Sequence, residues 1–423
     1  MFSKYSLNIL ERFLKTDINY LAKGSFWLGT GKAVSILVAL VLSLLYARLI
    51  DMEVYGEYRY ILSMLGTLGI FAVPGVATAI VRSVARGYEG TFRRGGFLIF
   101  FCSFGITIIG LGVASWFYMQ GRYSLAISLG VASLVVPFVE GLGNWRAYYE
   151  GKQLFCEKTI FNIFSSIFYG VLMAASILLL SGGWLTFFGS AVVVLVLAYL
   201  VGNAIPNIVF FIRAMRSVPR ASAVEPGSIR YGMHLSLLNV PTTVANYLDA
   251  LLLHAFIGPV ALAMYSFAVA LPEQLKSVFA IFATVSFPKL SSNVASSEGK
   301  NDLKKTLPNK IARATFLTTC IVTMYVFAAP TLYNVLFPAY KDAVFPSQIF
   351  ALSLIFFPVG VFGTAIKAEG NLKKIYLYEL FIPFIQIGML IAFIPLYGLW
   401  GAIFARLLAR IANHALAFIL FIA

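Results

Sequence analysis

Long apolar runs separated by short polar stretches dominate this chain of 423 residues. A helix needs roughly 20 apolar residues to cross a bilayer. Twelve stretches meet this requirement, and the pattern predicts membrane-spanning helices at about 24–48, 59–81, 95–118, 123–142, 159–181, 184–211, 231–257, 261–287, 311–336, 344–366, 375–395 and 398–421. The expected fold class is therefore an all-α polytopic membrane protein with about twelve transmembrane helices.

Polar positions interrupt the seventh and eighth predicted helices at helical spacing. Asn239, Asn246 and Asp249 recur at steps of three, four or seven and fall on one stripe of the seventh helix. Glu273 and Lys276 interrupt the eighth. A charge near the bilayer centre costs roughly 2.5–3.5 kcal/mol on insertion scales, so such groups line a wet cavity or pair inside a bundle. We interpret the stripe as the wall of a substrate path, the alternative being hydrogen bonds between packed helices.

Composition supports a membrane protein and argues against other classes. Apolar residues make up 60% of the chain, charged residues only 12%, and the mean hydropathy is +0.87. A soluble domain carries about 25% charged residues. The net charge of +15 resides in short loops between apolar runs, where basic residues set membrane orientation. Nucleic acid is therefore not expected as a partner.

The loop charges predict the topology. With a cytoplasmic amino terminus, most of the 32 Lys and Arg residues fall in cytoplasmic segments, and only Arg48, Arg59, Arg122 and Lys341 fall on the opposite side. This bias predicts that both termini are cytoplasmic. Residues 1–23 are expected to form an amphipathic helix on the cytoplasmic surface.

The predicted helices divide into two halves. A polar cytoplasmic linker at 213–230 separates six helices in an N-lobe, 24–212, from six in a C-lobe, 231–423. At an offset of 207 positions Tyr58 meets Tyr265 and Lys32 meets Asn239, which indicates a repeat with its site at the repeat interface. All outer loops are short, which argues against membrane glycosyltransferases and polymerases. No enzymatic activity is expected.

Several buried polar residues leave two interpretations open. Lys32 in the first helix either faces a cavity and binds an anion or extends to the cytoplasmic surface. Lys276 lies halfway along the eighth helix and either faces a cavity or pairs with Glu273, its i,i+3 neighbour. Pro74 and Pro272 lie in the second helix of each half, where each can introduce a bend.

The last predicted helix carries a basic face. Arg406 and Arg410 are one turn apart and could contact lipid phosphate or a carboxylate such as Glu379, and the sequence does not decide between these. The three cysteines are far apart and lack metal-ligand spacing. The chain has no phosphate-binding loop, zinc motif or nucleophile elbow. Neither a cofactor nor a metal is expected.

Two stretches and the first helix resemble a known family. They are ALAMYSFAVALPEQLKSVFAIFATVSFPKLSS at 261–292, the half-matching VYGEYRYILSMLGTLGIFAVPGVATAIVR at 54–82, and the stripe that contains Lys32. They look like the polysaccharide transporter family of lipid-linked O-antigen flippases, within the multidrug, oligosaccharidyl-lipid and polysaccharide exporter superfamily. The likeness in layout covers nearly the whole chain.

The resemblance implies a mechanism and a cargo. Two six-helix lobes would form a V that opens alternately to either side. The cargo would be an oligosaccharide on undecaprenyl diphosphate, moved from the cytoplasmic to the outer leaflet of the bacterial inner membrane. Expected partners are this lipid-linked oligosaccharide, membrane lipids, and a polysaccharide polymerase and glycosyltransferases.

The resemblance also implies roles for particular residues. A cationic central cavity would hold the diphosphate, and the residues expected to bind it there are Lys32, Asn239, Asn246, Asp249 and Lys276. Arg82 and Lys289 would flank the cytoplasmic mouth. The negative charges of Asp249 and Glu273 would partly balance the positive charges of the lysines. These two carboxylates could therefore bind a coupling ion or a proton.

The sequence leaves two functions open besides a flippase. A cation-coupled multidrug exporter of the same superfamily would depend on Asp249 and Glu273. A non-transporting membrane scaffold for polysaccharide synthesis would depend on the inner loops instead.

Overall fold

The computed structural model describes the backbone of residues 18–184, 190–294, 297–363 and 372–422, without the side chains of 18–26, 28, 278–308, 310, 372–373, 375 and 421–422. Within these ranges all regular structure is helical. A surface helix was predicted for residues 1–23, and residues 1–17 of it lie outside the described part of the chain. From Ile18 the chain already forms part of the first long helix.

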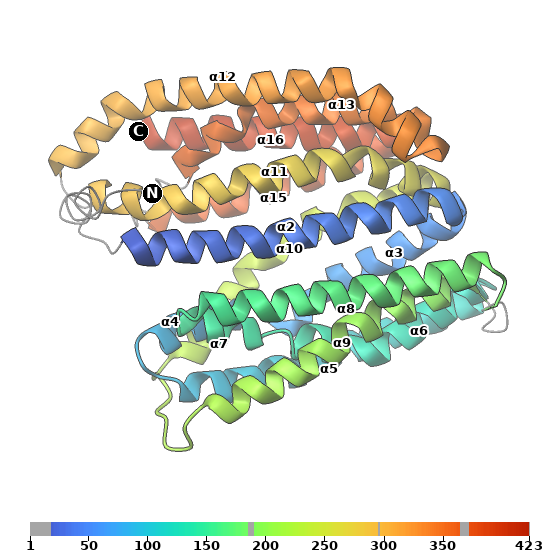
Figure 1. Ribbon diagram of the computed structural model, residues 1–423, viewed down its shortest axis with the longest axis horizontal. Helices are drawn as coiled ribbons and strands as arrows, with labels where there is room; N and C mark the ends of the chain where they lie inside the picture. Colours follow the sequence, from blue (N-terminus) through green and yellow to red (C-terminus); the bar gives the residue numbers. More distant parts are fainter. Residues whose placement is uncertain (1–17, 185–189, 295–296, 364–371, 423) are drawn as a thin grey trace.

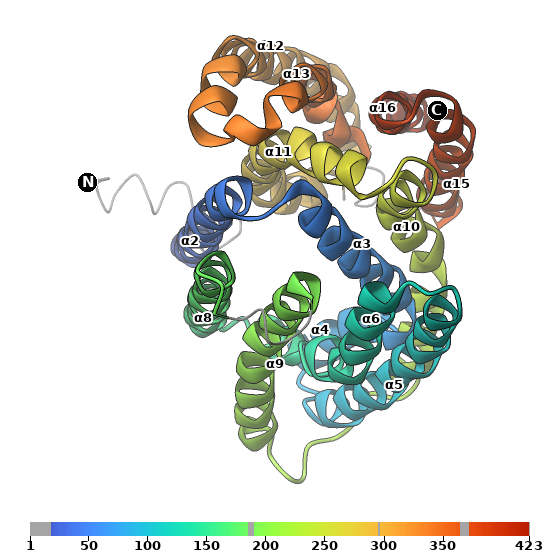
Figure 2. The same ribbon diagram turned by 90° about the vertical axis from the view of Figure 1, so that its right-hand side faces the viewer.

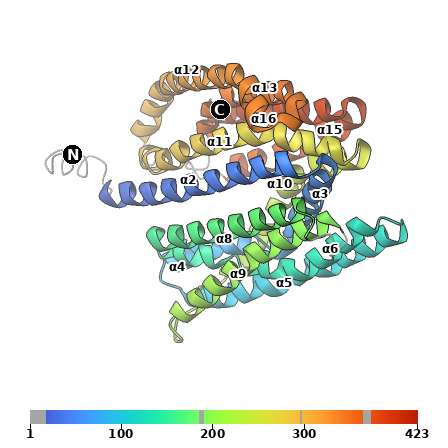
Figure 3. The same ribbon diagram turned by 45° about the vertical axis from the view of Figure 1, so that its right-hand side comes forward.

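The first bundle contains the helices that precede the linker. These are α2 (Ile18–Leu49), α3 (Met52–Leu68), η1 (Gly69–Ala72), α4 (Gly75–Ala85), α5 (Gly90–Met119), α6 (Tyr123–Val136), η2 (Pro137–Gly141), α7 (Trp145–Gly151), α8 (Phe155–Ser181) and α9 (Ala191–Ser217). Helix α2 packs along α8, α8 packs on α9, and α5 packs on α6. Figure 3 shows α2 between α8 and α11, at the border of the two bundles.

The second bundle contains the helices that follow the linker. These are α10 (Ser228–Phe256), α11 (Pro259–Val294), α12 (Ser297–Leu336), η4 (Pro338–Ala343), α13 (Val344–Leu352), η5 (Ser353–Gly360), α15 (Leu372–Tyr397) and α16 (Leu399–Ile422). Figure 1 shows the bundles as two layers of nearly parallel long helices. The end-on view in Figure 2 shows α3 crossing between them.

Each predicted span falls mainly on helical backbone in the part of the chain that the structure describes. Nine described helices are long and apolar enough to cross a membrane, and α3 with α4 makes a tenth as a bent pair. Helix α10 does not pass this test because it carries the polar stripe that the sequence singled out. The chain is an all-α multi-pass membrane protein.

The bent pair has a local cause at its break. Helices α3 and α4 meet at 52°. Between them Val73 adopts a left-handed conformation with φ of 45°, and Pro74 precedes α4. A proline lacks the N–H that would continue the helix, so the bend predicted at Pro74 is confirmed. Pro272 lies inside α11, which continues through it without a break.

Two glycines allow the bundles to approach each other closely. A Cβ atom on Gly56 of α3 would lie 1.9 Å from the carbonyl oxygen of Pro259, at the start of α11. A Cβ atom on Gly75 of α4 would lie 2.3 Å from the amide nitrogen of Ser236 in α10. The Gly75 amide instead donates a 3.0 Å hydrogen bond to the Ser236 hydroxyl. Backbone contact of this kind requires the smallest residue.

Aromatic rings join the bundles at the predicted outer end. Tyr55 of α3 packs against Phe267 of α11 with ring centroids 5.2 Å apart. Phe267 in turn stacks on Tyr340 of η4 at 3.8 Å. Phe267 and Tyr340 are buried. We name these three rings the outer aromatic cluster.

Candidate functional site

A cavity of about 640 Å³ lies between the two bundles. Its walls come from α2, α3, α8 and α9 of the first bundle and from α10, α11 and α16 of the second. A site at a lobe interface is the arrangement expected of transporters built from two repeats. We call this space the central cavity.

Tyrosine side chains make up a large part of the lining of the central cavity. Seven tyrosines line it: Tyr46, Tyr55, Tyr58, Tyr169, Tyr199, Tyr247 and Tyr265. A tyrosine combines a flat apolar face with a hydroxyl group that needs a hydrogen-bond partner when it is buried. Sugar rings offer complementary chemistry, because they present C–H groups on their faces and hydroxyls around their edges. The cavity wall therefore suits a carbohydrate.

Arg59 supplies a cation to this wall. It is half-buried, lines the cavity, and donates from Nε to the Ser266 hydroxyl of α11 at 3.3 Å. Within the described residues no carboxylate approaches it to ion-pair distance. The charge count placed Arg59 on the outer side at the first residue of a predicted span, but Arg59 lies two turns inside helix α3. Helix α3 begins at Met52, seven residues before the predicted span, because polar residues in its first two turns hide the helix from a hydropathy window.

Arg59 and Ser266 are also related by sequence. They lie 207 positions apart, which is the offset at which the two halves align. Equivalent positions of two repeats come into contact only near the axis that relates them. This contact is the one expected if the two halves are repeats and Arg59 lies near the axis that relates them.

Asp249 faces the central cavity but is fully engaged. It is only 2% exposed. Its Oδ1 accepts from the backbone N–H of Ala250 at 2.8 Å, and its Oδ2 accepts from the Tyr265 hydroxyl. Arg406 of α16 places Nε 2.7 Å from the same Oδ2. The carboxylate therefore has little capacity left for a cationic ligand.

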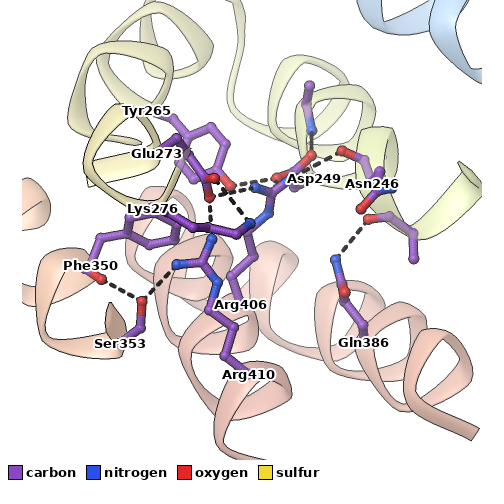
Figure 4. A network of polar contacts seen from close by, with 12 residues as sticks. Asn246, Asp249, Tyr265, Glu273, Lys276, Phe350, Ser353, Gln386, Arg406 and Arg410 are labelled. Carbon is purple, nitrogen blue, oxygen red and sulfur yellow. Dashed lines mark hydrogen bonds and ion pairs between the residues drawn. The ribbon is translucent and has the colours of Figure 1, made fainter. Parts of the chain in front are cut away.

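Glu273 is held in the same way by three cations (Figure 4). Lys276 lies 3.1 Å from Oε2, Arg410 pairs with Oε1, and Arg406 lies 3.9 Å from Oε1. Arg410 is fixed further by the Ser353 hydroxyl at 2.7 Å. The alternative in which Lys276 pairs with Glu273 is confirmed, and Arg406 and Arg410 bind carboxylates of the second bundle.

These five residues form one charge network, which we call the C-lobe network: Asp249, Glu273, Lys276, Arg406 and Arg410. Two negative charges are surrounded by three positive charges, so a single positive charge is in excess. Buried ion pairs of this kind are stable only when each charge keeps a partner. The ion-coupling role predicted for Asp249 and Glu273 stays a prediction, and their cation pairs weigh against it.

Lys32 does not line the central cavity, contrary to its predicted position. It lines a smaller polar pocket of about 300 Å³ inside the first bundle, with Arg146 of α7 among its other walls. We call this space the side pocket. Lys32 lies near the middle of α2 and packs towards α8 and α9, so the structure favours the cavity interpretation over extension to the surface.

Two further predicted cavity residues lie elsewhere. Lys276 lines a separate pocket of about 280 Å³ within the second bundle, because its pairing with Glu273 turns it towards α16. Asn239 is exposed and lies outside the central cavity lining. Only Asn246 and Asp249 of the five predicted residues line that cavity. The spacing along α10 shows which residues share a stripe, but it could not show that Asn239, nearer the start of the helix, lies outside the central cavity lining.

The predicted cytoplasmic mouth is described only in part. Arg82 is exposed at the end of α4, with its guanidinium 5.0 Å from the ring centroid of Tyr231. The side chain of Lys289 lies outside the described residues. Within the described residues no three His, Cys, Asp or Glu side chains gather at a site that could hold a metal ion.

The sequence of the chain matches a known protein family. Residues 21–294 match the sequence profile of the family described as Polysaccharide biosynthesis protein. The chain belongs to this family. A relative from Shigella flexneri, named "Putative O-antigen transporter", is 23% identical over 309 residues, which cover 67% of this chain and 70% of the relative.

Solved structures of the superfamily share the fold. The lipid II flippase MurJ in an inward closed conformation has a TM-score of 0.67 at 13% identity, covering 94% of this chain and 87% of MurJ. An inward-facing multidrug resistance MATE transporter of the MOP superfamily has a TM-score of 0.66 at 16% identity, with 91% and 93% covered. A MOP superfamily transporter from Pyrococcus furiosus has a TM-score of 0.64 at 16% identity, with 95% of each chain covered.

These matches define the class of the protein. Its fold is that of the MOP superfamily transporters, whose members have about twelve helices, and the described part of this chain contains nine or ten candidate membrane spans. Family and fold are those of transporters and flippases rather than enzymes. The family resemblance that the residues at 54–82 and 261–292 indicated is therefore confirmed, and the chain is a multi-pass membrane protein of this family.

Proposed function

We propose that this family member is a flippase for an oligosaccharide linked to undecaprenyl diphosphate, an O-antigen or exopolysaccharide unit. It moves this cargo from the cytoplasmic to the outer leaflet of a bacterial inner membrane by alternating access of its two lobes. Both termini are cytoplasmic, with Arg82 and Lys289 at the inner mouth. A polymerase and glycosyltransferases act beside it on the same polysaccharide.

One observation carries this proposal. The central cavity, between the bundles, is lined by seven tyrosines and by Arg59, which has no carboxylate partner in the described part of the chain. Tyrosines suit the faces and hydroxyls of sugars. An unpaired cation at membrane depth requires an anion, which an acidic sugar or a phosphate supplies.

The charge distribution also argues against the two alternatives. A multidrug exporter for organic cations needs a carboxylate free to meet its cargo. Both carboxylates that face the central cavity, Asp249 and Glu273, are already bound by arginines. A scaffold that transports nothing has no need for a polar cavity of about 640 Å³ between its lobes.

Replacing the cavity arginine tests the proposal. Arg59→Ala is expected to reduce surface polysaccharide at least about tenfold, because a hydrogen bond to a charged group contributes roughly 1.5–3 kcal/mol. Export is measured in cells that lack their own flippase, by gel analysis of surface polysaccharide at matched protein levels. Arg59→Lys retains the charge and is expected to restore part of the export.

Arg48→Ala is the matched control. Arg48 lies at the predicted outer end and donates to the carbonyl oxygen of Val335 at 3.0 Å, away from the central cavity. Its loss is expected to leave export close to normal. Full export by Arg59→Ala, or efflux of cationic dyes without any polysaccharide export by the unmodified protein, would refute the proposed function.

A further inference from the structure

We propose that the side pocket is the subsite for the diphosphate group of the cargo, while the central cavity holds the sugars. This inference rests on the proposed function and adds the orientation in which the cargo binds. It assigns the anion-binding role to Lys32 and Arg146, and it removes that role from Lys276.

Uncompensated charge is the first observation. Lys32 and Arg146 both line the side pocket, and no carboxylate lines it with them. Neither cation forms an ion pair within the described residues. Glu140 of η2 interacts electrostatically with Arg146, but it does not line the pocket and lies beyond the 4.0 Å ion-pair limit. The pocket is therefore lined by two positive charges, and no carboxylate in its lining forms an ion pair with either of them.

Such an arrangement requires a bound anion. Removing one cation from water at membrane depth costs several kcal/mol unless a partner compensates it. Two like charges that share one polar space increase this cost. The C-lobe network shows the contrasting solution, since two carboxylates there neutralise two of its three cations. A diphosphate carries at least two negative charges and would satisfy the side pocket as those carboxylates satisfy the C-lobe network.

The second observation is that Arg146 is held in a fixed position. Its Nε donates to the Asn162 side-chain oxygen at 2.9 Å, and its Nη1 donates to the carbonyl oxygen of Gly143 at 3.2 Å. These bonds leave Nη2 without a partner among the described residues. A guanidinium that is oriented in advance and still has free N–H groups is well suited to phosphate recognition.

The third observation is that the side pocket adjoins the central cavity. Ser35 of α2 and Ser166 and Tyr169 of α8 line both spaces. The two serine hydroxyls lie 3.1 Å apart and form a hydrogen bond between α2 and α8. A cargo can therefore bridge both compartments past this shared wall.

The volumes of the side pocket and the central cavity indicate which part of the cargo each would hold. The side pocket, at about 300 Å³, lies at the lower end of the range for small-molecule sites. The central cavity is about twice as large and contains the tyrosines. The compact, strongly charged group therefore fits the side pocket, and the bulky sugars fit the central cavity.

A binding experiment on the full-length protein in lipid nanodiscs tests the assignment. The probes are undecaprenyl diphosphate without sugars and undecaprenyl monophosphate, with binding measured by native mass spectrometry. The unmodified protein is expected to prefer the diphosphate. Lys32→Ala is expected to weaken diphosphate binding at least about tenfold and to abolish the preference, and Lys32→Arg is expected to restore both.

Lys276→Ala is the matched control, because it removes a lysine from the other lobe that is already paired with Glu273. It is expected to change diphosphate binding less than about threefold. Because Lys32→Ala could fail to fold, Lys32→Gln is measured in parallel, with monodispersity as the criterion for a folded sample. Loss of the diphosphate preference in either folded variant, with rescue by arginine, supports the subsite.

The outcomes separate this inference from the proposed function. Normal diphosphate preference in folded Lys32→Ala and Lys32→Gln, with loss in Lys276→Ala or Arg59→Ala, would overturn the subsite and leave the flippase proposal standing. An unmodified protein that binds neither lipid and exports no polysaccharide would overturn both.

Discussion

Arg406 is the residue on which the charge balance of the second bundle depends. Its guanidinium reaches Asp249 at 2.7 Å and Glu273 at 3.9 Å, and its Nη2 donates to the backbone oxygen of Asn246 at 2.9 Å. Three positions of α10 and α11 therefore depend on one side chain of α16. This explains why a basic face occurs in the last, otherwise apolar helix.

Removal of Arg406 should leave a buried charge without a partner. Arg406→Met is expected to destabilise the protein by about 3–5 kcal/mol, the usual cost of breaking a buried pair from one side. Thermal unfolding in detergent measures this change. The double substitution Asp249→Asn with Arg406→Met should recover a large part of the loss, because neither charge then remains. Equal destabilisation by the single and double variants would contradict this account.

The linker between α9 and α10 is attached to the first bundle by one of its acidic residues. Glu225 accepts a 2.5 Å hydrogen bond from the Ser83 hydroxyl and pairs with Arg86 at 2.8 Å. The Glu225 amide also donates to the Thr91 hydroxyl oxygen at 3.0 Å. Gly227 follows with a φ of 74° and directly precedes α10. The linker is therefore attached to the first bundle, and Gly227 makes the left-handed turn from it into α10.

This attachment should depend on pH. The Ser83 hydrogen bond and then the Arg86 charge lower the pKa of Glu225 below its ordinary value of 4.5. A lowered folded-state pKa stabilises the protein at pH values above the ordinary one, and the benefit is lost as pH falls through the folded-state pKa. The Tm difference between the unmodified protein and Glu225→Gln is therefore expected at pH 7 and should shrink below about pH 4. A difference that stays constant over this range would exclude the carboxylate as its source.

At the scale of the whole molecule, the two bundles are held together at their predicted outer end. The outer aromatic cluster of Tyr55, Phe267 and Tyr340 joins α3 to α11 and η4. Gly56 allows α3 to meet the start of α11 at the same end. Access to the central cavity from this side requires that these contacts separate. We therefore expect the cluster to close the central cavity at the predicted outer end.

Phe267→Ala should weaken this closure. Labelling of an Asn246→Cys reporter by a membrane-impermeant thiol reagent added outside the cell is expected to accelerate about fivefold or more, the change that roughly 1 kcal/mol produces in an equilibrium. The three native cysteines are replaced beforehand. Phe316→Ala is the control, because Phe316 is 73% exposed on α12 and belongs to no inter-bundle contact of this cluster. Equal labelling in both variants would exclude the cluster as the closure.

The number and approximate place of the helices could be predicted from sequence because hydropathy is a local property. A run of about 20 apolar residues must be helical in lipid, since every backbone group needs a partner inside its own segment. The bend at Pro74 could also be predicted, because a proline disrupts the helix at its own position. The start of α3 could not be predicted by this rule, because Glu53, Glu57 and Arg59 lower the hydropathy of its first two turns, although Glu57 and Arg59 bind side chains of other helices. Residue identity alone does not show whether a side chain faces protein or lipid.

The sequence by itself determined that this protein is a helical membrane transporter and that Lys32, Asp249, Glu273 and Lys276 are unusual. Only the tertiary structure decided which of these charges are neutralised. Lys276 and Lys32 look alike along the chain, yet one is paired with Glu273 and the other has no counterion in the described residues. The partners Asp249 and Arg406 are 157 positions apart. Electrostatic compensation depends on distances of a few ångströms between helices, and these distances are set by packing.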